Sequence, residues 1–189
     1  MTGHPDAQDA IAMADLAADR DHALDCLMER HAEKLFHYLI RVLQNHDDAA
    51  EVAQEAFVRV YEHRAKFNPE QKFTTWLYTI ATNLARDRMR WRSRHLAVSL
   101  EALSSPPSLN AAHPELSPSE QLESSELLSL IRGAVAGLPE DLRVPFVLAQ
   151  YENLSQAQIA AILKCSVKAV ETRVYRARKL LRERLAQFV

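Results

Sequence analysis

The sequence predicts an all-α protein with two small helical domains, joined by a flexible linker, and a helix-turn-helix in the second domain. Only three glycines occur among the 189 residues, too few for a turn-dense β-sandwich. Apolar residues instead recur at helical spacing on both sides of residues 96–120, a stretch rich in proline and serine that lacks lysine and arginine. We therefore expect domains at 1–95 and 121–189, separated by a linker at 96–120.

The first domain is expected to contain three helices. The first runs from about residue 21 to 44, where leucines recur at near-helical spacing. The second opens at Asp47 or Asp48, with Glu51 placed to complete a capping box, and runs to about Lys66. Its predicted buried arc consists of Ala49, Val52, Ala53, Ala56, Phe57 and Val60. After a loop from Phe67 to Phe73, a third helix begins near Thr74 or Thr75 and ends near Arg94.

The second domain begins with a helix from about Glu120 to Ala136. Another helix follows with Pro139 at its first position, and Pro145 inside it predicts a kink or a late start. Ser155 and Gln158 form a capping box that opens a short helix to about Leu163. After a tight turn at 164–166, a long helix runs from Val167 to about Phe188. A short helix, a turn and a long helix are typical of a helix-turn-helix, which places its second helix in the DNA major groove.

Charge is concentrated in blocks, although the formal net charge is only -2. Residues 86–95 hold five arginines against one acidic residue, and residues 164–184 hold eight basic residues against two acidic ones. Residues 1–62, by contrast, have a net charge of -8. Two compact basic blocks in an acidic chain indicate two separate contacts with a polyanion.

The long C-terminal helix has a basic outer face. Its predicted buried stripe is Val167, Val170, Val174, Ala177, Leu181 and Leu185. The outward side chains are then Lys168, Thr172, Tyr175, Arg176 and Lys179, which combine phosphate-seeking charges with groups that can reach base edges. We interpret this face as a DNA-reading surface. The alternative is a solvated basic helix on a bundle.

The helix that ends at Arg94 carries aromatic, amide and basic groups. Leu77, Ile80, Ala81, Leu84 and Trp91 are expected to point toward the core. Trp76, Asn83, Arg90 and Arg94 share an adjoining arc, with Thr79 and Arg86 beside them. Arginines follow a phosphate backbone, an aromatic ring stacks on bases and an amide reads an exposed base edge, which together suit single-strand capture. The alternative, an ordinary core tryptophan and a surface asparagine, stays open.

The helix before it has an acidic face formed by Glu51, Glu55, Val58 and Glu62. Glutamates four residues apart repel each other, so we expect this face to weaken its own helix and to serve a basic protein partner. A solvated face without a partner is the alternative.

Sequence motifs for catalysis, metal binding or cofactor binding are not found, so we expect a non-enzyme without cofactor or metal. The pair His22 and Cys26 is too small to be a metal site. Cys26 and Cys165 are expected to be reduced packing residues. No apolar stretch approaches the length of a membrane span, and the N-terminus lacks the pattern of a signal peptide, which predicts a cytoplasmic protein without membrane insertion.

Two stretches resemble bacterial RNA polymerase sigma factors of the extracytoplasmic-function (ECF) group. DDAAEVAQEAFVRVYEHRAKFNPEQKFTTWLYTIATNLARDRMR is similar to sigma region 2, and LPEDLRVPFVLAQYENLSQAQIAAILKCSVKAVETRVYRARKLL is similar to region 4. The resemblance implies a transcription initiation factor that binds core RNA polymerase, at the coiled coil of the largest subunit and at the flap, and directs it to promoters. It also implies an anti-sigma partner. A free-standing helix-turn-helix regulator and a purely helical interaction protein are the other hypotheses.

The resemblance implies three sets of site residues. The docking set, for polymerase, is Glu51, Gln54, Glu55, Val58 and Glu62. The minus-10 set, for a captured single strand, is Phe67, Asn68, Lys72, Trp76, Asn83, Arg86, Arg90 and Arg94. The minus-35 set, for duplex DNA, is Lys168, Glu171, Thr172, Arg173, Tyr175, Arg176 and Lys179. Glu171 departs from the family's basic or small residue, and a carboxylate there repels phosphates unless it accepts from a cytosine amino group.

Overall fold

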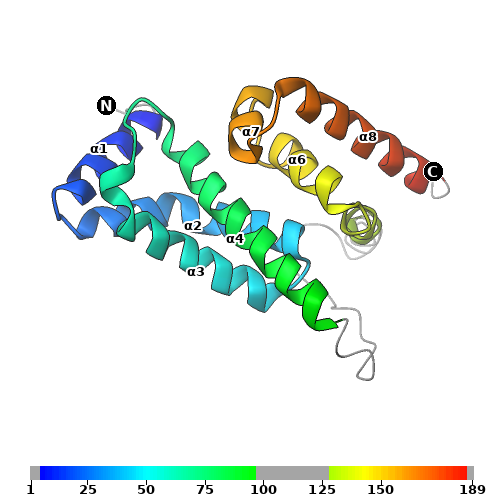
Figure 1. Ribbon diagram of the computed structural model, residues 1–189, viewed down its shortest axis with the longest axis horizontal. Coiled ribbons are helices and arrows are strands. Elements are labelled where there is room, and N and C mark those ends of the chain that lie inside the picture. Colours follow the sequence, from blue (N-terminus) through cyan, green and yellow to red (C-terminus); the bar gives the residue numbers. More distant parts are fainter. Residues whose placement is uncertain (1–4, 97–127, 187–189) are drawn as a thin grey trace, which may run out of the picture.

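The computed structural model describes residues 5–96 and 128–186, and these residues contain helices and no strands. The all-α prediction is therefore confirmed. The first domain consists of α1 (Pro5–Ala17), α2 (His22–Leu43), α3 (His46–Glu62), a 3-10 turn η1 (Arg64–Lys66) and α4 (Phe73–Leu96). In the second domain residues 128–136 are helical and are followed by α6 (Glu140–Gln150), α7 (Gln156–Leu163) and α8 (Val167–Leu185). Figure 1 shows the two groups of helices side by side, with α8 on the outer side of the second domain.

The core of the first domain lies between α2, α3 and α4. Leu27, Leu35, Leu39 and Val42 of α2 are fully buried, as the leucine spacing predicts. In α3 the predicted arc is buried except for Ala53, which is only partly buried and packs against the core. Leu77 and Ala81 of α4 complete this core. Since burial of one such aliphatic side chain contributes about 1.5–3 kcal/mol, this shared apolar face holds the three helices together.

Helix α1 is an element that the sequence analysis missed. Its buried residues include Met13, Leu16 and Asp9, whose side chain is 2% exposed. Asp9 accepts hydrogen bonds from Arg30 at 2.9 Å and pairs with His31 at 2.8 Å, both on α2. Apolar periodicity does not reveal this helix, because one of the contacts that hold α1 in place is made by the buried carboxylate of Asp9.

The start of α3 differs from the prediction. Asn45, and not an aspartate, is the N-cap, and its side chain accepts from the Asp48 backbone N–H at 2.8 Å. The expected capping box with Glu51 is therefore wrong, because Glu51 lies too far into the helix and pairs with Arg88 instead. The regular helix also ends at Glu62, and residues 64–66 form the 3-10 turn.

The second domain follows the predicted order of elements. The expected start of its first helix near Glu120 falls outside the described residues, as do residues 97–120 of the expected linker and the predicted end at Phe188. Pro139 is the N-cap of α6 rather than its first residue. The late start expected from Pro145 is wrong, because α6 begins at Glu140 and continues through this buried proline, whose apolar neighbours Val144 and Phe146 are also buried.

Among the described residues no helix has the length and apolar character that a membrane crossing requires.

Candidate nucleic-acid and polymerase interfaces

Local hydrogen bonds fix the geometry of the helix-turn-helix. The predicted capping box is confirmed: the Ser155 backbone N–H donates to Gln158 Oε1 at 3.0 Å, and the Gln158 backbone N–H donates to Ser155 Oγ at 3.3 Å. Lys164 ends α7 in the left-handed conformation with φ 51°. Ser166 then caps α8 by accepting from the Ala169 backbone N–H at 3.2 Å. Because both ends of the turn are capped, α8 is held at a defined angle to α7.

The outer face of α8 carries the minus-35 set. Lys168, Thr172, Tyr175, Arg176 and Lys179 are exposed, whereas Glu171 and Arg173 are partly buried. Tyr175 is 68% exposed, which is unusual for so large an apolar ring. Arg173 Nη1 lies 3.7 Å from Cys165 Sγ, so its guanidinium lies at the flank of the face. Val167 was expected in the buried stripe but is 41% exposed, because it is the first residue of α8, at the edge of the packed surface.

Glu171 has a cationic neighbour on its own helix. Its carboxylate pairs with Lys168 Nζ at 3.2 Å, and the Thr172 hydroxyl donates to the Lys168 carbonyl at 2.9 Å. This exposed ion pair lowers the local negative charge that would otherwise face a phosphate. Arg176 makes no ion pair or hydrogen bond to any of the described residues, so its five donors are directed to solvent.

Three aromatic side chains of the first domain form a cluster at the start of α4. The rings of Phe67 and Trp76 have centroids 5.2 Å apart, and those of Phe73 and Trp76 are 6.3 Å apart. Phe73 is buried, while Phe67 and Trp76 are partly buried. Lys72 pairs with Asp6 of α1 at 2.6 Å, and Asn68 Oδ1 accepts from the Glu70 backbone N–H at 3.0 Å. Trp76 therefore packs against the core and keeps part of its surface exposed.

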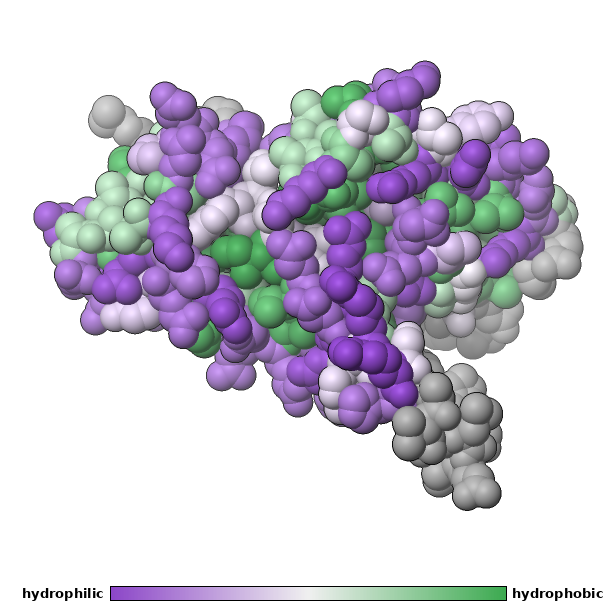
Figure 2. Space-filling view, viewed as in Figure 1, coloured by the Kyte–Doolittle hydropathy of each residue, from purple (hydrophilic) through white to green (hydrophobic). Residues whose placement is uncertain are grey.

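Four further polar members of the minus-10 set lie on α4, from its middle to its C-terminal end: Asn83, Arg86, Arg90 and Arg94. Asn83 is exposed and has no side-chain hydrogen bond among the described residues, whereas Arg90 pairs with Asp87 at 3.1 Å. Arg86 is directed to the second domain, where it lies 3.7 Å from Glu140 of α6. The Nε atoms of Arg90 and Arg94 donate to the carbonyls one turn earlier. Figure 2 shows hydrophilic side chains over this end of α4.

Trp91 corrects one prediction and adds one candidate residue. The helical spacing predicts a core position for Trp91, but its ring is 50% exposed and stacks on His95 with ring centroids 4.1 Å apart. The reason is that α4 extends past the start of α3, where Arg88 and Arg92 pair with Asp48, so within the described part of the chain α3 does not cover the last turns of α4. An exposed indole among arginines is a stacking surface for an unpaired base.

The docking set lies along α3. Gln54 and Val58 are exposed, Val58 by 44%, and both side chains are uncharged. Glu51 pairs with Arg88 at 2.6 Å, and Glu55 pairs with Arg59 at 2.7 Å. The expectation that this face weakens its own helix is therefore wrong, because it neglected Arg59, which lies 3.9 Å from Glu62 as well. The hydrogen bond that Arg88 donates to the Glu51 carboxylate raises the pKa of Arg88.

Both cysteines are free thiols. Cys26 is exposed, so its expected role in packing is wrong, whereas Cys165 is partly buried against the core. Within the described ranges no group of three or more histidine, cysteine, aspartate or glutamate side chains is placed to hold a metal ion.

The fold and the exposed basic face of α8 define a two-domain, helix-turn-helix DNA-binding protein. Residues 27–95 match the family model for sigma-70 region 2, and residues 128–181 match the model for sigma-70 region 4. The chain is 34% identical over 171 residues to the ECF RNA polymerase sigma factor SigW of Bacillus subtilis, covering 88% of this chain and 90% of the relative. It is 31% identical over 162 residues to the RNA polymerase sigma-H factor of Pseudomonas aeruginosa, covering 84% of each.

Solved structures share the two-domain helical fold. CnrH in complex with the cytosolic domain of CnrY has a TM-score of 0.70 and 26% identity, covering 95% of this chain and 98% of that one. The sigma factor RpoE in complex with the anti-sigma factor NepR from Bartonella quintana has a TM-score of 0.72 over 86% of this chain and 96% of that one, and at 23% identity it supports the fold alone. The chain belongs to the ECF group of the sigma-70 family and is a transcription initiation factor that directs RNA polymerase to promoters.

Proposed function

We propose that the two domains of this sigma factor, residues 1–95 and 121–189, have separate roles at one promoter. The minus-35 set on α8 reads the upstream element as duplex DNA, and the minus-10 set on α4 and the preceding loop captures the downstream element as a single strand. The chain itself catalyses no reaction, so the chemistry of RNA synthesis belongs to the polymerase.

The observation that carries this proposal is the exposed group of Thr172, Tyr175 and Arg176 on the second helix of a capped helix-turn-helix. A guanidinium can donate two hydrogen bonds to guanine O6 and N7 in the major groove. A hydroxyl can donate to or accept from the edges of different bases. Arg176 is available for such a contact because no carboxylate of the described chain neutralises it. A buried or fully paired basic helix would not support duplex readout.

The properties of α4 favour a different mode of DNA binding. Asn83 offers both a donor and an acceptor to a base edge, and Trp76 and Trp91 offer ring surfaces on the same helix. Base stacking on an aromatic side chain contributes about 1–3 kcal/mol per base and requires a base that has left the duplex. We therefore assign strand capture to this helix.

Polymerase binding is assigned to α3 and to the second domain. The centre of the docking set on α3 consists of two exposed side chains, the polar Gln54 and the apolar Val58. Glu55 and Glu62 lie beside them. Such a surface fits a basic coiled coil in the largest subunit of the polymerase, and the second domain fits the flap. An anti-sigma factor is a further expected partner, because CnrH and RpoE were each solved with a protein bound.

The test is transcription in vitro from a library of genomic fragments by core polymerase, with and without this protein. We expect a small, reproducible group of fragments to be transcribed from defined start sites only when the protein is present. A free-standing regulator would instead bind a duplex operator tightly by itself, usually as a dimer on a near-palindrome. A purely helical interaction protein would leave the transcript profile unchanged, and charge reversal at Arg90 or Arg176 would not affect its activity.

A further inference from the structure

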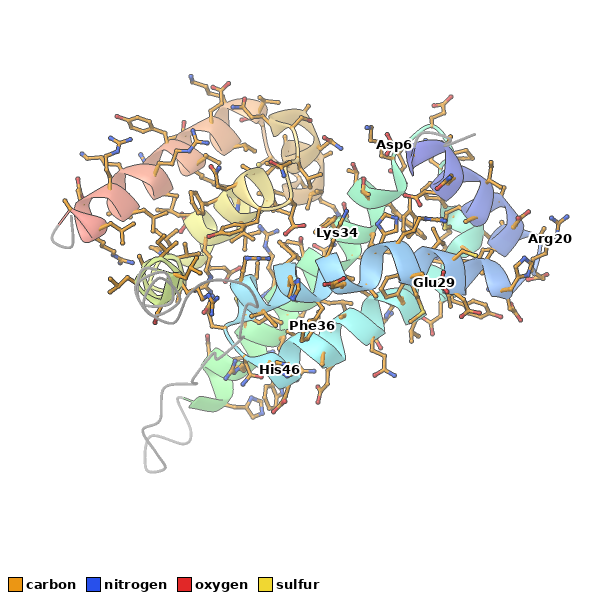
Figure 3. All side chains as sticks on the ribbon, turned by 180° about the vertical axis from the view of Figure 1, so that it is seen from behind. Asp6, Arg20, Glu29, Lys34, Phe36 and His46 are labelled. Atoms are coloured by element: carbon orange, nitrogen blue, oxygen red, sulfur yellow. The ribbon has the colours of Figure 1, made fainter. Side chains whose placement is uncertain are left out.

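The second turn of α8 carries two neighbouring hydrogen-bond acceptors. The Thr172 hydroxyl donates its only proton to the Lys168 carbonyl at 2.9 Å, so its oxygen can only accept from a further partner. The residue before it, Glu171, ends in a carboxylate, which has no proton to donate when it is ionised. Figure 3 shows side chains of α8 that project outward, away from α6. This turn of the helix therefore offers acceptors to a partner outside the protein.

Lys168 holds only one of the two carboxylate oxygens of Glu171. Its Nζ atom lies 3.2 Å from Glu171 Oε2, whereas Oε1 has no hydrogen-bond partner in the part of the chain that the structure describes. The Glu171 side chain is 41% exposed, so it stays accessible to a donor from outside the protein. The pair of Lys168 and Glu171 carries no net charge, which reduces the repulsion that a lone carboxylate meets from DNA phosphates.

The chemistry of the major groove limits which base can satisfy Glu171. Only cytosine, at N4, and adenine, at N6, present a donor there, whereas guanine and thymine present acceptors. A carboxylate opposite guanine or thymine loses its water without gaining a hydrogen bond. Adenine also places its N7 acceptor beside the amino group, where it repels the carboxylate, while cytosine presents only its N4 amino group. Cytosine is therefore the base that suits Glu171 best.

The next turn of α8 offers the opposite chemistry. Arg176 is exposed and has no ion pair or hydrogen bond to the described residues, so its guanidinium is available to guanine O6 and N7. It follows Glu171 by five residues, or about 7.5 Å along the helix axis, which corresponds to about two base-pair steps of 3.4 Å. A carboxylate at cytosine and a guanidinium at guanine can thus both be satisfied within one short stretch of duplex.

We propose that Glu171 is a specificity-determining residue of this sigma factor. Its carboxylate accepts a hydrogen bond from the N4 amino group of a cytosine in the minus-35 element, while the other carboxylate oxygen stays paired with Lys168. The inference rests on the duplex readout by α8 proposed above and adds the identity of one base to it. The competing role for Glu171 is purely electrostatic, because a carboxylate that only repels phosphates lowers the affinity for all sequences alike and selects no base.

Selection from a promoter library with a randomised upstream element separates these two roles. Holoenzyme is reconstituted from core polymerase and this protein, and the templates that it binds are sequenced. We expect the parent protein to prefer cytosine at one position by about tenfold, and Glu171→Ala to lose this preference while those at other positions persist. Glu183→Ala is the matched control and should keep all preferences. Glu183 also pairs with a lysine of α8, Lys179 at 3.8 Å, but lies near the C-terminal end of the helix.

A chemical change in the DNA tests the contact itself. N4-methylcytosine at the selected position places a methyl group where the amino proton faces the groove. Binding of the parent holoenzyme should therefore fall about tenfold, and binding of the Glu171→Ala holoenzyme should not change.

Three results would overturn the proposal. The first is a Glu171→Ala holoenzyme that gains affinity for all templates alike and keeps the parent's base preferences, because Glu171 would then only repel phosphates. The second is a preference that depends on Glu171 but selects a base other than cytosine. The third is a parent holoenzyme that is insensitive to N4-methylation. A parent holoenzyme without any base preference in the upstream element would instead contradict the proposed duplex readout.

Discussion

The two helices that we propose to contact DNA, α4 and α8, differ in how many of their polar side chains already have partners within the protein. On α8, Tyr175 and Arg176 are exposed, and Arg176 is free of ion pairs with the described chain. On α4 and its preceding loop, Lys72 pairs with Asp6, Arg86 with Glu140 and Arg90 with Asp87. A duplex can be read by a rigid outer face that needs no rearrangement. Capture of a single strand by α4 requires some of these internal pairs to be exchanged for phosphates.

The largest effect is expected at the aromatic cluster of the first domain. Trp76→Ala removes ring contacts with Phe67 and Phe73 and should lower the free energy of unfolding by about 3 kcal/mol, because large aromatic truncations leave a cavity. Chemical denaturation of the parent protein and the variant measures this difference. Trp91→Ala is the control, because the Trp91 ring is half exposed and its loss should change stability by less than about 0.5 kcal/mol. Equal losses would mean that Trp76 is not a core contact.

On α8 the expected effect concerns binding rather than folding. Arg176→Ala should weaken engagement of the upstream duplex element by about 1–3 kcal/mol and leave the association with core polymerase unchanged. Electrophoretic mobility shift with reconstituted holoenzyme on duplex fragments measures the first quantity, and gel filtration with core enzyme the second. Arg182→Ala, an exposed arginine in the last turn of the same helix, is the control for loss of charge alone. If both variants lose affinity equally, α8 makes only nonspecific phosphate contacts.

Asn83→Ala separates strand capture from duplex binding. The side chain is exposed, so stability should change by less than about 0.5 kcal/mol. Closed complexes should form normally, while strand opening should slow about tenfold, equivalent to about 1.4 kcal/mol. Permanganate reactivity of unpaired thymines over time measures opening, and normal opening would remove Asn83 from the minus-10 set.

Elements with a strong apolar period could be predicted from the sequence, and so could the capped helix-turn-helix. The capping box of α7, formed by Ser155 and Gln158, can be recognised from residue types alone, because the interaction is local. The errors arose where long-range partners decide the outcome. α1 is held partly by the Asp9 contacts with α2, and Trp91 is exposed because its neighbouring helix begins too late to cover it. The burial of Glu152, in the loop between α6 and α7, could not be predicted from the sequence, since its partners Tyr78 and Arg41 belong to the other domain.

The same distinction between local sequence patterns and long-range contacts applies to the site residues. Exposure of Tyr175 and Arg176 follows from a helical wheel, because α8 packs with one face only. The pairing of Arg86 with Glu140 depends on contacts between residues far apart in the sequence, which a wheel cannot represent.

The most direct test of separate duplex and single-strand contacts is a combined footprint of holoenzyme on one promoter that this protein selects. Hydroxyl-radical cleavage should show protection of intact duplex upstream, while permanganate should react with thymines confined to the downstream element. Core enzyme alone should give neither signal. Permanganate reactivity that extends over both elements, or none at either, would contradict the assignment of α8 to paired DNA and of α4 to a melted strand.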